Sequence, residues 1–146
     1  NLPEKFKMTY INSNGEKQTP FMIHRALLGS IERFFGILIE HYAGKFPTWL
    51  APIQCRLLPL VDSATVFSGE VAQALDRAGI RYDVDDSNEK LGYKVRKAQV
   101  EKIPLAVIIG EKEVSEKKLT IRSRDSKFQP ILTANEFIQQ ILENKL

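Results

Sequence analysis

The sequence of 146 residues contains a single cysteine, Cys55. One thiol cannot form an intramolecular disulfide or supply a cysteine-rich zinc knuckle. We therefore expect a reducing, cytoplasmic compartment. Long apolar runs are also scarce, because the longest, at 37–39 and 105–109, are far shorter than the roughly 20 residues that cross a bilayer. We expect no membrane segment.

An initiator methionine and a charged-then-apolar leader are both missing from residues 1–5, Asn-Leu-Pro-Glu-Lys. We expect a piece of a longer protein. Charge of one sign is only slightly in excess, with a formal net charge of +3 and a pI of about 9.0. This balance permits a nucleic-acid partner but does not require one.

The first third of the chain predicts a hairpin and a long helix. Two β-prone runs, at 6–12 and 17–23, flank Asn14-Gly15, a dipeptide that suits a tight hairpin turn. Apolar residues then recur at helical spacing over 25–42, which predicts a mostly buried helix. The proline-bounded stretch 46–52 reads as an ordered connector. We expect the domain boundary there, between residues 51 and 52.

The rest of the chain alternates strands with helices. Strands are expected at 54–60, 80–84, 105–109 and 119–124, helices at 64–78, 90–101 and 134–142, and a hairpin at 110–118. Thr133 and Glu136 have the spacing of a capping box for the last helix. The predicted fold is α/β, with three layers and a mixed sheet of about five strands flanked by helices, over residues 52–146.

Two glycines and an arginine share one stripe of the predicted first helix. Gly29, Arg33, Gly36 and Glu40 fall at i, i+4, i+7 and i+11. Each interior glycine costs a helix roughly 1 kcal/mol relative to alanine. A flat ligand could therefore lie against the glycines while Arg33 binds a phosphate or a carboxylate. Tight helix packing with Arg33 in a salt bridge explains the stripe equally simply.

His24 lies just before this helix. A lone histidine without partners cannot form a zinc site, so its spacing alone favours a structural role. His41, near the helix C-terminus, suits the helix dipole.

The run Met22-Ile-His-Arg-Ala-Leu-Leu-Gly-Ser-Ile-Glu-Arg-Phe-Phe35 resembles threonyl-tRNA synthetases, as does His41-Tyr-Ala-Gly-Lys-Phe-Pro-Thr-Trp-Leu-Ala-Pro52. Its Gly-Ser-x-Glu-Arg part is similar to motif 3 of class II synthetases. The resemblance implies that His24 is one of three zinc ligands in a threonine-selecting site. It also implies that Arg33 contacts ATP phosphate as a catalytic residue, and that Gly29 lies against the adenine with Ser30 beside it.

The stretch Asp85-Asp-Ser-Asn-Glu-Lys-Leu-Gly-Tyr-Lys-Val-Arg96 resembles the anticodon-binding part of the same family, with Ser87 in place of the usual arginine. The segments 110–114 and 121–124 also match. By this resemblance the anticodon contacts fall on Asn88, Glu113 and Arg122.

The residues support an RNA surface independently of the resemblance. Leu119 and Ile121 should face the core, which places Thr120, Arg122 and Arg124 on the opposite face of their strand. Arginines there can stack on or hydrogen-bond to unpaired bases. Lysines predicted to share one helical face suit phosphate contacts; they are Lys90, Lys94 and Lys97. The plain alternative is a solvated helix face beside a sheet edge blunted by charge.

The resemblance implies that residues 1–51 end a class II catalytic core and that 52–146 form the anticodon-binding domain. The full protein would be a homodimer that uses zinc, magnesium and ATP to attach threonine to tRNA(Thr), and the fragment alone would be inactive. The rival interpretations are a synthetase for proline, histidine or glycine, and a non-catalytic RNA-binding paralogue.

Overall fold

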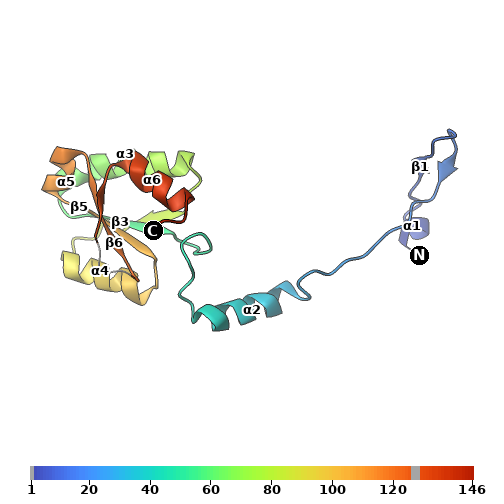
Figure 1. The fold of residues 1–146 in the computed structure, drawn as a ribbon, viewed down its shortest axis with the longest axis horizontal. Helices are drawn as coiled ribbons and strands as arrows, with labels where there is room; N and C mark the ends of the chain where they lie inside the picture. Colours follow the sequence, from blue (N-terminus) through green and yellow to red (C-terminus); the bar gives the residue numbers. More distant parts are fainter. Residues whose placement is uncertain (1, 126–128) are drawn as a thin grey trace. The chain divides into compact units, whose positions relative to one another are not determined.

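The computed structural model describes residues 2–125 and 129–146, drawn in Figure 1. The chain forms two compact units, 1–36 and 37–146. Because the connector belongs with the second unit, this division differs from the boundary expected between residues 51 and 52. That domain boundary stays a prediction. In the described part of the chain, no helix has both the length and the apolar character needed to cross a membrane.

The first unit contains a short helix and the expected hairpin. Helix α1 (Leu2–Lys5) precedes β1 (Tyr10–Ile11), which pairs antiparallel with β2 (Lys17–Gln18). The strands are shorter than predicted. Their turn uses Gly15 at a φ of +79°, a conformation open to glycine without strain.

Helix α2 (Ile31–Tyr42) begins later than the sequence predicts. Gly29 has a φ of +66°, which no right-handed helix accommodates, and Ser30 accepts the first helical bond from the Phe34 amide at 3.0 Å. Gly29 therefore lies before the helix and outside the predicted stripe. No residue of α2 is buried, so the expectation of a mostly buried helix is wrong for this chain.

The second unit is built on a mixed sheet with the strand order β4-β3-β5-β6-β7. The central strand β3 (Cys55–Pro59) pairs in parallel with β4 (Tyr82–Val84) and β5 (Leu105–Ile109). Antiparallel pairing adds β6 (Leu119–Ser123) and then β7 (Ile131–Leu132). The three-layer α/β prediction is confirmed.

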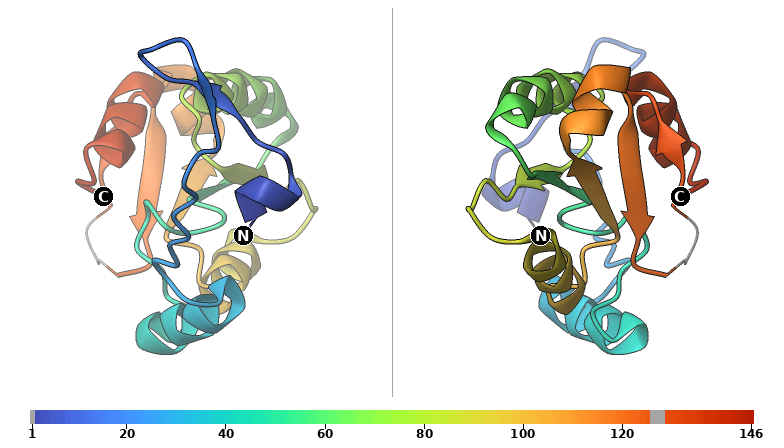
Figure 2. Two further views of the ribbon diagram at one scale, coloured as in Figure 1. Left: turned by 90° about the vertical axis from the view of Figure 1, so that its right-hand side faces the viewer. Right: turned by 90° about the vertical axis from the view of Figure 1, so that its left-hand side faces the viewer.

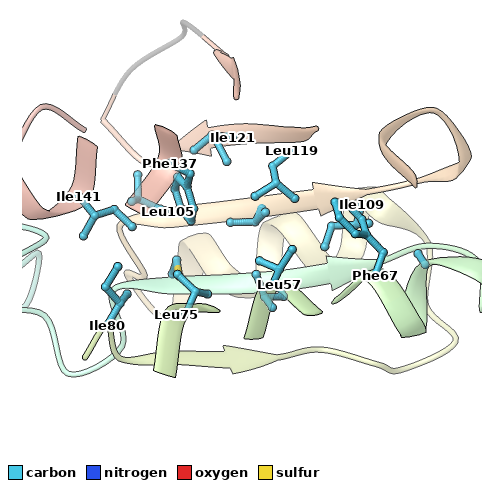
Figure 3. Packing of buried hydrophobic residues seen from close by; sticks show 14 residues of the cluster. Leu57, Phe67, Leu75, Ile80, Leu105, Ile109, Leu119, Ile121, Phe137 and Ile141 are labelled. Atoms are coloured by element: carbon cyan, nitrogen blue, oxygen red, sulfur yellow. The ribbon is translucent and has the colours of Figure 1, made fainter. Parts of the chain in front are cut away.

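Helices cover the sheet on both faces (Figures 1 and 2). Helices α3 (Asp62–Arg77), α5 (Glu111–Glu116) and α6 (Ala134–Leu142) lie on one face, and α4 (Leu91–Val100) lies on the other. The larger core packs α3 and α6 against β3, β5 and β6, as Figure 3 shows, and includes Leu57, Leu75, Leu105, Ile121 and Phe137. A smaller core under α4 contains Leu58, Val95, Ala98, Ile103 and Ala106.

One prediction about the tail is wrong, and one strand was missed. The residues after Gly110 form α5 rather than a hairpin, because the Glu113 carboxylate folds back onto the Gly110 amide at 2.9 Å and caps a short helix. The fifth strand is β7, whose two residues are too few for a recognisable alternation. The capping box of α6 is confirmed, with Thr133 accepting from the Glu136 amide.

The Cys55 thiol is fully buried in the larger core. Burial, with a further contribution from the negative charge of Asp83, raises its pKa to about 12. Since the thiolate is the reactive form, we expect no alkylation of the native protein by iodoacetamide at pH 8 and complete alkylation in denaturant. Mass spectrometry measures both. Labelling of the native chain at the rate of a free thiol would contradict this burial.

Candidate nucleic-acid interface

A pocket of about 560 Å³ lies between α4 and β6. Arg122 enters it from β6 because the strand alternates. Leu119 and Ile121 are fully buried on one face, while Thr120 and Arg122 lie on the other face, beside α4. This alternation confirms the predicted orientation. The pocket, which we call the α4–β6 groove, is lined by Leu91, Gly92, Val95, Arg96, Gln99 and Arg122.

Glu113 is fixed at the start of α5. One carboxylate oxygen accepts the Gly110 amide at 2.9 Å, and the other accepts the Thr120 hydroxyl at 2.7 Å. Burial favours the neutral acid, but these hydrogen bonds outweigh it and lower the pKa of Glu113. Glu113 is therefore a charged acceptor held in place. Thr120 and Arg122 are two residues apart on one face of β6, so the Glu113 carboxylate reaches that face from the first turn of α5.

Asn88 lies in the loop between β4 and α4, which is anchored by Asp85. The Asp85 carboxylate accepts the Ser87 amide at 3.2 Å and the Ser87 hydroxyl at 2.5 Å, and it pairs with Lys97 at 3.4 Å. Ser87 thus closes the loop. Asn88 and Lys90 are exposed, and Asn88 lines a polar pocket of about 170 Å³ beside the start of α3.

The Asp85 anchor has a pH dependence. Burial would raise the pKa of Asp85, but the hydrogen bonds from Ser87 and the charge of Lys97 lower it. A lowered pKa stabilises the fold above the ordinary value near 4, and this stability is lost as the pH falls through the lower folded value. We expect the unfolding free energy of the wild type to fall more steeply between pH 5 and 3 than that of Asp85→Asn, which has no carboxylate to protonate. Urea titrations measure this, and equal losses would exclude the anchor.

Lys94 does not join Lys90 and Lys97 on a solvated face, contrary to the sequence prediction. Its side chain is only 2% exposed. The ammonium donates to the carbonyl oxygens of Pro59 and Asp85, each at 2.8 Å. Position 94 lies on the face of α4 that packs against the sheet. The lysine side chain can therefore reach the end of β3 at Pro59 and the loop that begins at Asp85. It holds the Asn88 loop against the end of β3.

Arg124 is placed differently from Arg122. Its guanidinium donates to the carbonyl oxygens of Lys102 at 2.8 Å and Phe46 at 3.2 Å, and pairs with Asp125 at 2.6 Å. These contacts hold the connector at residues 46–52, and Arg124 does not line the α4–β6 groove. That Arg124 binds RNA stays a prediction, and in this structure its guanidinium is engaged by protein carbonyls and by Asp125.

Two groove residues were missed from the sequence. Arg96 and Gln99 lie on α4 beside Arg122. The signal that could have found them is their spacing from Gly92, at i+4 and i+7, which places them along one edge of the helix.

The candidate residues of the first unit lie near the start of α2, and all are exposed. Ser30 forms a short hydrogen bond to the Glu32 carboxylate at 2.5 Å, and its hydroxyl accepts the Arg33 amide at 3.4 Å. Gly29 precedes them, and a side chain added there would meet nothing within 4 Å. His24 lies in the extended segment before them.

Comparisons with known proteins agree with this geometry. The anticodon binding domain family matches residues 54–144. The threonine–tRNA ligases of Clostridium tetani and Clostridioides difficile are 48% and 51% identical to the chain over 140 residues, which is 96% of the chain and 22% of each relative. The chain thus spans about a fifth of these curated relatives. The resemblance to threonyl-tRNA synthetases is confirmed.

Solved structures show the same fold. The RNA binding domain of threonyl-tRNA synthetase from Cryptosporidium parvum Iowa II is 33% identical with a TM-score of 0.77, over 97% of this chain and 36% of that one. Prolyl-tRNA synthetase of Cryptosporidium parvum shares the fold at 19% identity and a TM-score of 0.67, over 97% and 30% of the two chains. With most of its length matched by the family, the chain belongs to the anticodon binding domain family.

Proposed function

We propose that the chain is the C-terminal part of a threonine–tRNA ligase and that its second unit reads the anticodon of tRNA(Thr). The observation that carries the proposal is the α4–β6 groove, where Arg122 of β6 and Arg96 of α4 line the same pocket. The Glu113 carboxylate reaches the face of β6 that carries Arg122, and Asn88 precedes the helix that forms one wall. The threonine–tRNA ligases among the relatives support the choice of tRNA.

The chemistry of the groove suits unpaired bases. A guanidinium can donate to the O6 and N7 atoms of guanine, and an amide can both donate and accept at a base edge. Arg122 takes the first role in the groove, and Asn88 takes the second from the loop before α4, where it lines a separate pocket. The fixed carboxylate of Glu113 accepts from base amino or imino groups. Lys90 and Arg96 contact phosphate, which positions the RNA without reading its sequence.

The full-length enzyme would activate threonine with ATP and magnesium, as a cytoplasmic homodimer. We propose Arg33 as a catalytic contact to ATP phosphate, with Gly29 and Ser30 beside the adenine. The exposure of all three residues leaves them accessible to a ligand. The fragment alone is expected to be inactive.

Zinc is proposed for the full enzyme, with His24 as one ligand. A catalytic zinc site uses three protein ligands, and no group of three or more His, Cys, Asp and Glu side chains comes together within residues 2–125 and 129–146. The residues present therefore do not form the site by themselves. The remaining ligands would come from elsewhere in the longer protein, and we derive no step through the metal.

Binding to a threonine anticodon stem-loop tests the proposal. The control is the same stem-loop with the central G and third U of the anticodon exchanged. We expect the native loop to bind more tightly by about 1–3 kcal/mol per base read, measured at near-physiological salt because phosphate contacts weaken with ionic strength. Arg122→Ala should erase this preference. Equal binding of both loops by the wild type would exclude sequence-specific reading.

Two alternatives have distinct outcomes. A synthetase for proline, histidine or glycine would prefer the corresponding anticodon loop. A non-catalytic RNA-binding paralogue would read the threonine loop but would remain unable to form threonyl-adenylate when extended to full length. The similar fold of prolyl-tRNA synthetase favours including a proline loop in the binding series.

A further inference from the structure

The side of α4 that turns away from β6 exposes an aromatic ring and an aliphatic side chain. Tyr93 is 57% exposed and Val100 is 72% exposed, and they are seven residues apart, which places them on one face of the helix. They border a shallow depression of about 240 Å³ whose other residues are Arg96, Lys97 and Glu101. Isolated exposed apolar residues are common, but here two of them share one depression with two cations.

Two cations, Arg96 and Lys97, line this depression. Glu101 also lines it and pairs with the buried Arg56 at 2.6 Å, but Arg56 pairs with Asp83 as well, so this trio keeps one net negative charge and any phosphate must be held by Arg96 and Lys97. Lys97 has one contact at 3.4 Å, to Asp85, and its side chain is 44% exposed. The Asp85 carboxylate is itself satisfied by Ser87. Lys97 can therefore turn to a phosphate at small cost.

Arg96 connects this depression to the α4–β6 groove, because it lines both. A strand of RNA that leaves the groove over Arg96 therefore reaches Tyr93 next. Exposed aromatic rings flanked by cations are the usual means of holding unpaired nucleotides, since the base stacks on the ring while the phosphate meets the charge.

We propose that Tyr93 is a stacking platform for one unpaired loop nucleotide outside the bases read in the groove, with Lys97 at its phosphate. The inference rests on the proposed function and extends the RNA surface across α4. Stacking is insensitive to base identity, so this contact adds affinity without adding anticodon preference.

The test compares Tyr93→Ala and Tyr93→Phe with the wild-type 146-residue chain, on both the native and the exchanged stem-loop. Tyr93→Ala should weaken binding of the two loops equally, by about 5- to 150-fold, whereas Tyr93→Phe should stay within about twofold because it keeps the ring. Val66→Ala is the matched control: Val66 is 73% exposed on α3, on the opposite face of the sheet. Circular dichroism checks that each variant folds.

A 2-aminopurine placed in turn at each loop position outside the anticodon gives a direct readout. Its fluorescence should be quenched by the wild type and by Tyr93→Phe at one position and recover in Tyr93→Ala. Unchanged affinity of Tyr93→Ala, with the wild type still preferring the native loop, would overturn the platform and leave anticodon reading intact. Failure of the wild type to bind either stem-loop would overturn both the stacking platform and the proposed anticodon reading.

Discussion

Replacing Lys94 by methionine is expected to lower the free energy of unfolding by about 2–4 kcal/mol. The methionine keeps most of the buried stem volume but removes the ammonium, which strands the carbonyl oxygens of Pro59 and Asp85. Each buried acceptor without a donor costs about 1–3 kcal/mol, and the relief of a buried charge offsets part of this. Urea or thermal unfolding followed by circular dichroism measures the loss.

Lys97→Met is the control for this prediction. Lys97 is three positions along the same helix, but it is partly exposed and makes one long ion pair, so we expect a change below about 1 kcal/mol. Lys94→Met should also weaken binding of the native stem-loop, because the loop that carries Asn88 loses its attachment to β3. Equal stabilities of the two variants would show that the buried ammonium contributes nothing.

Arg124→Ala is expected to reduce stability by about 2–3 kcal/mol while leaving the preference between native and exchanged stem-loops unchanged. Its guanidinium donates to the carbonyls of Lys102 and Phe46. A hydrogen bond from a charged group contributes about 1.5–3 kcal/mol, and the bond to Lys102 adds little because it is exposed to solvent. Without the bond to Phe46, the connector at residues 46–52 is no longer held to the end of β6. Thermal unfolding and stem-loop titration measure the two effects separately.

Arg122→Ala is the matched variant, because it removes the other arginine of this segment. This variant should no longer prefer the native stem-loop over the exchanged one, because Arg122 lines the groove. Its free energy of unfolding should change by less than about 1 kcal/mol, because Arg122 is only partly buried. If Arg124→Ala abolished the loop preference in a chain that still folds normally, Arg124 would contact RNA as the alternation of its strand first suggested.

The long elements of the second unit could be predicted from the sequence because each has a clear period or a clear stop. The apolar run of β5 and the capping box of α6 are examples. Helix α5 and strand β7 could not be predicted. Six and two residues are too few for a period to appear, and α5 depends on a carboxylate that bonds to its own first turn and to Thr120 on a different strand.

For the candidate site too, some residues could be placed from the sequence and others could not. Arg122 was identified correctly as facing away from the core, because strand alternation is a local rule. The roles of Lys94 and Arg124 depend on carbonyl oxygens at Pro59 and Phe46, which are 35 and 78 positions away in the chain. No local pattern encodes these contacts. Position 94 reads as a solvated lysine until the sheet beneath it is known.

The pairing of β3 with β5 sets the order in which this surface can form. Cys55 pairs with Leu105, so the centre of the sheet closes a loop of about 50 residues before any strand of the second half can add to it. During synthesis β4 becomes available to β3 before β5 does, and β6 with its arginine can pair only once β5 is present. The α4–β6 groove therefore cannot exist before β6 has been added, and a nascent chain that ends before β6 would have no groove for the RNA that we propose it binds.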